Sequence, residues 1–170
     1  SLNRLSGFEF EDLVTLGDVV FTIQKIEMVR RIADEINWYI YELGEEGRLV
    51  SLQMDELITD LPEETYLLFK DYLVNPAREE IDKILAGLRS FDAEDLLEMN
   101  LVSRLVGMGS FSLDSPLVPR GYRILHKIPR LPMPVVDNLV TAFMNLQGVI
   151  NASIKELDNV EGIGEVRARA

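Results

Sequence analysis

The feature that most limits the possible folds is a run of apolar residues at helical spacing between residues 18 and 43. The steps of three and four positions place these residues on one face of an α-helix. The stripe consists of Val19, Ile23, Ile26, Val29, Ala33, Ile36, Ile40 and Leu43. Trp38 and Tyr39 lie near it, and we expect both in a core or an interface. Gly44 follows and suits a helix end, so we predict a single long helix.

Further helical patterns follow this stripe, and no segment shows the apolar–polar alternation of a β-strand. Helices are predicted over 49–58, from Pro62 to Asn75, from Pro76 through Leu88, from the N-cap Asp92 to Gly107 with a break near Asn100, and over 135–143. Residues 1–112 are therefore predicted to form an elongated helical bundle or spine, and the whole chain to be all-α.

A short turn near the C-terminus carries the clearest functional pattern, apolar-x-Gly-apolar-Gly between two helical segments. Glycines let the main chain turn through positive φ, and the N–H groups that open the next helix can bind an anion such as a phosphate. The pattern is that of a helix-hairpin-helix hairpin. We predict that DNA contacts come from Val160, Glu161, Gly162, Ile163 and Gly164, followed by Arg167 and Arg169.

The region around this turn repeats at an offset of 32 residues, so that the hairpin 128–132 corresponds to 160–164. In the first copy, Arg130 and Pro132 replace the two glycines, and prolines have no N–H to donate. We assign this copy mainly to packing, with Lys127 and Arg130 as auxiliary positive charges for DNA binding.

The predicted second domain covers residues 113–170 and is a tandem helix-hairpin-helix DNA-binding domain, truncated at its C-terminus. The boundary lies in a stretch rich in glycine, serine and proline. Ala170 falls inside a predicted helix, and Ser1 stands where an initiator methionine would be expected. We therefore expect the chain to be part of a longer protein.

Charge is distributed unevenly along the chain, whose net charge is −12. Residues 1–118 carry 10 lysines and arginines against 24 aspartates and glutamates, whereas residues 119–170 carry 7 against 5. An acidic body repels DNA, and only the C-terminal part tolerates it. We therefore expect weak, salt-sensitive binding that does not read the base sequence.

Several other function classes are disfavoured. The carboxylate pairs, such as Glu45–Glu46 and Glu79–Glu80, have no cysteine or histidine beside them and are interpreted as solvated helix surface. His126, the single histidine, is interpreted as an ordinary interface residue. We expect no catalytic residue, no metal ligand and no cofactor in this chain. The lack of a long apolar run and of cysteine favours a cytoplasmic protein without a membrane span.

The chain resembles the family of bacterial DNA integrity scanning proteins, DisA, over essentially its whole length. The resemblance rests on the segments 10–14, 42–49, 119–125 with 127–132, and 160–164. It implies a homo-octameric diadenylate cyclase that joins two ATP molecules into cyclic di-AMP with a divalent metal ion. It also implies a helical linker and a domain that binds branched DNA, which suppresses the cyclase. The Asp-Gly-Ala and Arg-His-Arg motifs of the cyclase domain are absent from this sequence.

Three functions remain open at this point. The first is a DNA-sensing regulatory segment of such a cyclase, partnered by the N-terminal cyclase domain and by branched or junction DNA. The second is a purely structural or interaction module whose hairpins only pack. The third, an independent enzyme, is disfavoured because no nucleophile, base or metal constellation is present.

Overall fold

The computed structural model describes residues 14–164 and 168. The chain divides into two compact units, and we describe each separately. The first contains the described residues up to 66 together with 76–116, and the second contains 67–75 and the described residues from 117 onward. The predicted all-α class is confirmed, because the only extended pairing in the described part is an isolated bridge between Thr15 and Pro116.

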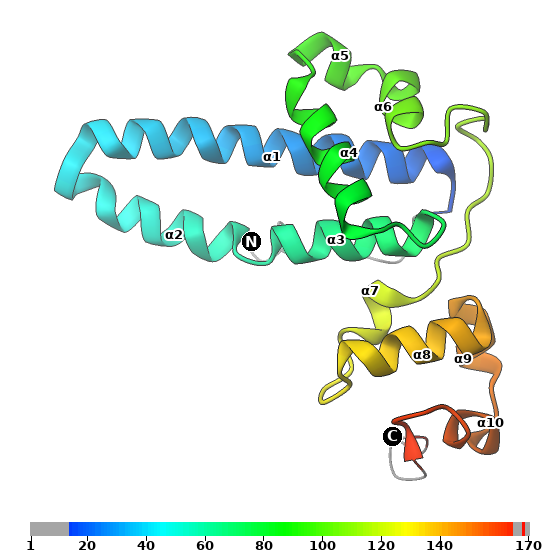
Figure 1. Cartoon of the computed structure of the whole chain (residues 1–170). Helices are drawn as coiled ribbons and strands as arrows, with labels where there is room; N and C mark the ends of the chain where they lie inside the picture. Colours follow the sequence, from blue (N-terminus) through cyan, green and yellow to red (C-terminus); the bar gives the residue numbers. More distant parts are fainter. Residues whose placement is uncertain (1–13, 165–167, 169–170) are drawn as a thin grey trace. The chain divides into compact units, whose positions relative to one another are not determined.

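The first unit is organised around α1 (Leu16–Leu43), as the apolar stripe predicts. Thr15 and Asp18 form a capping box, in which each side chain accepts a hydrogen bond from the main-chain N–H of the other. Gly44 takes a φ of 62° and ends the helix. After the 3₁₀ turn η3 (Gly44–Gly47), α2 (Arg48–Ile58) returns antiparallel beside α1 (Figure 1).

Three shorter helices cover the N-terminal half of α1: α4 (Arg78–Ser90), α5 (Ala93–Leu97) and α6 (Met99–Leu105) (Figure 1). Asp92 caps α5 as predicted, and the predicted break lies at Glu98, between α5 and α6. Polar side chains of α1 satisfy carbonyl groups at these helix ends. Gln24 donates to the carbonyl of Leu96, and Arg31 donates to those of Leu88 and Phe91.

The apolar stripe of α1 is buried mainly in its first half. Ile23 is 3% exposed and Ile26 8%, whereas Trp38 is 60% and Tyr39 53% exposed. A core position for Trp38 and Tyr39 is therefore wrong within this chain, and an interface role stays a prediction. The cause is geometric, because α4–α6 cover the first half, whereas η3 and α2 are the described elements that lie against the second (Figure 1).

The second unit begins within α3 (Leu61–Tyr72), from Leu67 onward. It continues with α7 (Tyr122–Leu125), α8 (Met133–Phe143), α9 (Leu146–Asn151) and α10 (Ile154–Asp158). The sequence pattern did not predict α9. The core of the unit consists of Leu67, Tyr122, Leu125, Val135, Val136, Leu139, Val140, Val160 and Ile163. The predicted second domain, residues 113–170, did not include the segment 67–75, which belongs to this unit.

Candidate nucleic-acid interface

The second hairpin is a tight turn whose two apolar residues anchor it. Val160 is 8% exposed and Ile163 6%, whereas Glu161, Gly162 and Gly164 are exposed. The N–H of Ile163 donates to the carbonyl of Val160 at 3.0 Å, which closes a four-residue turn. Gly162, with a φ of 89°, occupies the third position, where a type II turn requires a positive φ. The sequence pattern thus encodes a turn that two buried apolar side chains anchor, while the residues between and after them are exposed to solvent.

The two glycines of this hairpin have different roles. A Cβ on Gly162 would lie 2.7 Å from Cγ2 of Val135, so the core beneath the turn excludes a side chain there. Gly164 has a φ of 57°, and a Cβ built on it meets no atom within 4 Å. No acceptor within residues 14–164 and 168 bonds the N–H of Gly164. The space over Gly164 is therefore open to a ligand that approaches the main chain.

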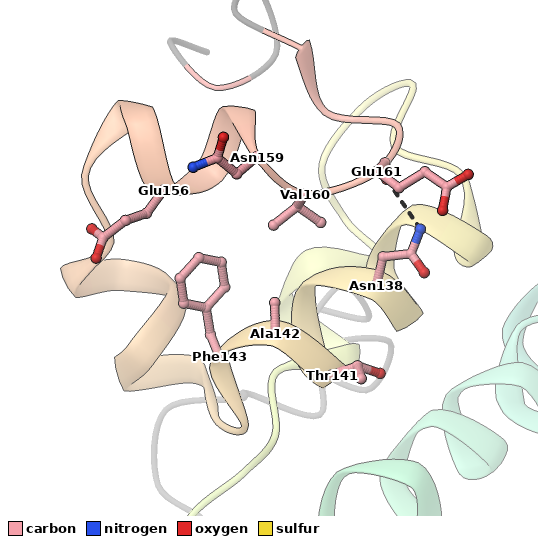
Figure 2. Close-up of a pocket in the computed structure, with 8 residues that line it drawn as sticks. All are labelled: Asn138, Thr141, Ala142, Phe143, Glu156, Asn159, Val160 and Glu161. Atoms are coloured by element: carbon pink, nitrogen blue, oxygen red, sulfur yellow. Dashed lines mark hydrogen bonds between the residues drawn. The ribbon is translucent and has the colours of Figure 1, made fainter.

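Helix α8 holds the hairpin in place from one side. Asn138 Nδ2 donates to the main-chain carbonyl of Glu161 at 3.0 Å, and Val160 faces Ala142 and Phe143 (Figure 2). These residues line an open cavity of about 470 Å³ between α8, α10 and the hairpin. Sequence reasoning did not identify Asn138, because its partner is 23 residues away and no local motif pairs the two.

Acidic side chains prevail around the second hairpin. Residues 153–164 contain one lysine, Lys155, and three acidic residues, Glu156, Asp158 and Glu161. Ser153 and Glu156 form the predicted capping box, and the hydrogen bonds from Ser153 lower the pKa of Glu156. Side chains in this part of the chain therefore offer little net positive charge to an anion. Arg167 and Arg169 lie outside the described residues, and their roles stay predictions.

The first hairpin repeats the geometry of the second at the offset of 32 residues. The N–H of Leu131 donates to the carbonyl of Ile128 at 3.2 Å, as Ile163 does to Val160. Arg130 has a φ of 63° in the place of Gly162. Lys127 and Arg130 are both exposed.

Few main-chain donors are available where the first hairpin meets α8. Pro132 is the N-cap and Pro134 lies in the first turn, and neither has an N–H. The N–H of Val135 donates to the carbonyl of Pro132. The first hairpin is therefore unsuited to hold an anion through the main chain, as its sequence predicts.

A carboxylate on α3 holds the start of α7. Asp71, which is buried, accepts hydrogen bonds from the N–H groups of Gly121, Tyr122 and Arg123 at 2.8, 2.6 and 3.3 Å. Burial raises the pKa of Asp71, and the three donors oppose that rise. Sequence reasoning missed this residue as well, since its partners follow it by about 50 positions.

A lysine next to this carboxylate ties α3 to α8. Lys70 Nζ lies 2.7 Å from Asp137 Oδ1 and 4.2 Å from the centre of the Tyr122 ring. Burial, with a smaller effect from Asp137, raises the pKa of Tyr122 to about 12. The end of α3 is thus built into the helices that carry both hairpins.

Other kinds of site have little support in the described part of the chain. No group of three histidine, aspartate or glutamate side chains there converges as metal ligands would. Glu45, Glu46, Glu79 and Glu80 are exposed. The described helices include none that is both long enough and apolar enough to cross a bilayer.

The fold and these two hairpins define an all-α helix-hairpin-helix protein. A family model for the helix-hairpin-helix motif matches residues 145–170, which include the second hairpin. Another, the DisA bacterial checkpoint controller linker region, matches residues 1–113. The chain therefore belongs to the DisA family.

Curated relatives resemble the chain from end to end. The DNA integrity scanning protein DisA of Carboxydothermus hydrogenoformans is 52% identical and covers 100% of this chain, which matches 49% of that protein. DisA of Bacillus subtilis is 50% identical over 99% of this chain and 47% of the relative. DisA of Acidothermus cellulolyticus is 48% identical over 98% and 46%. The chain spans about half the length of these relatives.

Proposed function

We propose that this chain is the linker and DNA-binding segment of a DNA-integrity-scanning diadenylate cyclase of the bacterial cytoplasm. In this proposal the second hairpin binds the sugar–phosphate backbone of branched DNA without reading its base sequence. DNA binding then regulates cyclic di-AMP synthesis by an N-terminal cyclase domain, in a homo-octamer. Family membership and the names of the relatives support the assignment.

The observation that carries the proposal is the open main chain at Gly164. Its left-handed conformation and the free space over its Cα suit close approach of a phosphate oxygen. Buried Val160 and Ile163 fix the turn before any ligand arrives, so binding requires little reorganisation. Contacts from main-chain N–H groups to phosphates position a protein on DNA but carry no base information.

ATP and a divalent metal ion belong, in this proposal, to the cyclase domain of the longer protein. The described residues do not fit them, because they hold no metal-ligand cluster, and the sequence lacks the cyclase motifs. We therefore assign no catalytic step to this chain.

The alternative function is a structural or interaction module without DNA binding. The observation in its favour is the apolar surface along the second half of α1 and on α2, where Tyr41, Leu49 and Leu52 are 60% exposed or more. Large contiguous patches of exposed apolar side chains are typical of surfaces that contact other proteins. Such a surface is compatible with a DNA-binding second unit, so it does not displace the first proposal.

A matched pair of glycine substitutions tests the proposal. Gly164→Ala places a methyl group in the open space where the phosphate would approach. Gly44→Ala is the control, because Gly44 has a φ of 62° and equally open surroundings but lies in the first unit. Alanine is strained at both positions, and more so at Gly44, whose ψ of −129° lies outside the left-handed helical region.

The measurement is fluorescence anisotropy of a labelled four-way junction at 50 mM KCl. We expect Gly164→Ala to weaken binding at least fivefold and Gly44→Ala to leave it unchanged. In the longer protein, the same substitution should relieve inhibition of cyclic di-AMP synthesis by the junction. Equal affinities for both variants would reject the hairpin as the binding site and favour the interaction module.

A further inference from the structure

We propose that the first hairpin is a second phosphate-binding site, which works through the guanidinium group of Arg130. The two hairpins would then hold the DNA backbone by different chemistry, a side-chain cation in one and main-chain N–H groups in the other. This inference rests on the proposed function, and it gives Arg130 a main role where the sequence suggested packing with an auxiliary positive charge.

The first observation is that Arg130 occupies the same structural position as Gly162. The hydrogen bond from Leu131 to Ile128 matches the bond from Ile163 to Val160, and the bond from Ile128 to Leu125 matches the bond from Val160 to Leu157. Arg130 and Gly162 both have a positive φ, 63° and 89°. The first hairpin thus keeps the turn, although arginine stands where a positive φ favours glycine.

The second observation is that this conformation is unfavourable for arginine. A non-glycine residue in the left-handed region carries backbone strain, and such residues gather at functional sites. Within residues 14–164 and 168, no hydrogen-bond or ion-pair partner is found for the Arg130 side chain, which is exposed. The guanidinium group is therefore available to an external anion.

The third observation is that the first hairpin has lost the other means of binding an anion. Pro129, Pro132 and Pro134 remove three main-chain donors around the turn. A planar guanidinium can bind two phosphate oxygens at once and needs no main-chain help. The second hairpin shows the opposite combination, with open main chain at Gly164 and mostly acidic side chains nearby.

The two kinds of contact respond differently to salt, and this difference provides the test. A cation that neutralises a phosphate releases counterions, which adds about 0.9 to the slope of log affinity against log salt concentration. A neutral N–H group adds no such release. We therefore expect the first hairpin to contribute to the salt slope and the second to contribute affinity with little change in slope.

The experiment measures binding of the full chain to a labelled four-way junction by anisotropy between 25 and 200 mM KCl. The test variants are Arg130→Gln and Arg130→Gly, and Gly164→Ala represents the other hairpin. Arg89→Gln is the charge-matched control, since Arg89 is exposed on α4 in the first unit. Thermal unfolding is recorded for each variant, because glycine should relieve the strain at position 130 and leave the protein at least as stable.

We expect both Arg130 variants to bind about fivefold more weakly at 50 mM KCl, with a slope shallower by about 1. Arg89→Gln should leave the slope unchanged, and Gly164→Ala should lower the affinity without changing the slope. If the unaltered chain binds but the Arg130 variants keep its slope, the inference is wrong and the proposed function stands. If the unaltered chain binds no junction at any of these salt concentrations, the proposed function fails and the inference with it.

Discussion

The carboxylate of Asp71 accepts a hydrogen bond of 2.6 Å from the main-chain N–H of Tyr122, which lies 51 positions later in the chain. Together with the bonds from Gly121 and Arg123, it gives α7 an N-terminal cap that α7 does not supply itself. The first hairpin follows α7 directly. The position of that hairpin therefore depends on a residue of α3.

Replacing this cap should destabilise the second unit. Asp71→Ala leaves three main-chain N–H groups without their acceptor, and we expect a loss of about 3 kcal/mol in the free energy of unfolding. Amide hydrogen exchange should accelerate in α7 while α1 stays protected. Asp82→Ala, on the exposed surface of α4, is the control. Unchanged protection of α7 in Asp71→Ala would show that the cap contributes little.

The bond between Asn138 and Glu161 should support DNA binding without contacting DNA. Asn138→Ala removes the donor that holds the Glu161 carbonyl, so we expect junction affinity to fall about threefold with an unchanged salt slope. Thr141→Ala is the control, because Thr141 lines the same cavity but bonds only within α8. An equal loss in both variants would assign the effect to α8 rather than to the hairpin.

The acidic side chain of the second hairpin should oppose DNA binding. Glu161→Gln removes one negative charge and keeps the main-chain carbonyl that Asn138 binds. We expect affinity to rise about threefold at 25 mM KCl, and the gain to shrink at 200 mM because salt screens exposed charges. Glu79→Gln, far along the chain in α4, should not alter affinity. A gain of the same size at both salt concentrations would contradict an electrostatic cause.

A buried hydroxyl in the first unit should be a source of instability. Ser103 Oγ is buried and has no hydrogen-bond partner among the described residues. Ser103→Ala removes this unpaired polar group, so we expect the first unit to gain about 1 kcal/mol in stability. Chemical denaturation measures the change, with Ser90→Ala as the control at an exposed hydroxyl that bonds the carbonyl of Gly87. A clear loss of stability would indicate a partner for Ser103.

The first unit should lose stability in acid through Glu27. Burial alone would raise the pKa of Glu27, but hydrogen bonds and charges from Arg30 and Arg31 outweigh it and lower the pKa below 4.5. Because the folded state favours the ionised form, this contribution is present above the unfolded pKa and disappears as pH falls through the folded value. Glu27→Gln should therefore flatten the stability profile below pH 4.5. A profile that stays equally steep would exclude Glu27 as the group responsible.

Local patterns predicted most of the helices and the turn. The long helix, the cap at Asp92, the capping box at Ser153 and the turn at Gly162 each depend on residues within a few positions of one another. Such features are encoded locally, so the sequence alone indicates them.

Features that depend on distant partners were not predictable in this way. Asp71 and Asn138 act on main-chain groups that the chain brings near only after folding. The exposure of Trp38 has the same origin, because periodicity identifies the apolar face of a helix but not the helix that covers it. The left-handed Arg130 contradicts its own conformational preference, and only the repeat offset pointed to its position.

The discontinuous second unit determines how this protein can be dissected genetically. Leu67 completes its core and Asp71 its helix cap, yet both precede the apparent boundary loop by about 40 residues. A gene fragment that starts at that loop would encode both hairpins without these two supports. If such a fragment failed to bind DNA, the missing supports would explain it. A fragment designed to contain the whole second unit must also include residues 67–75.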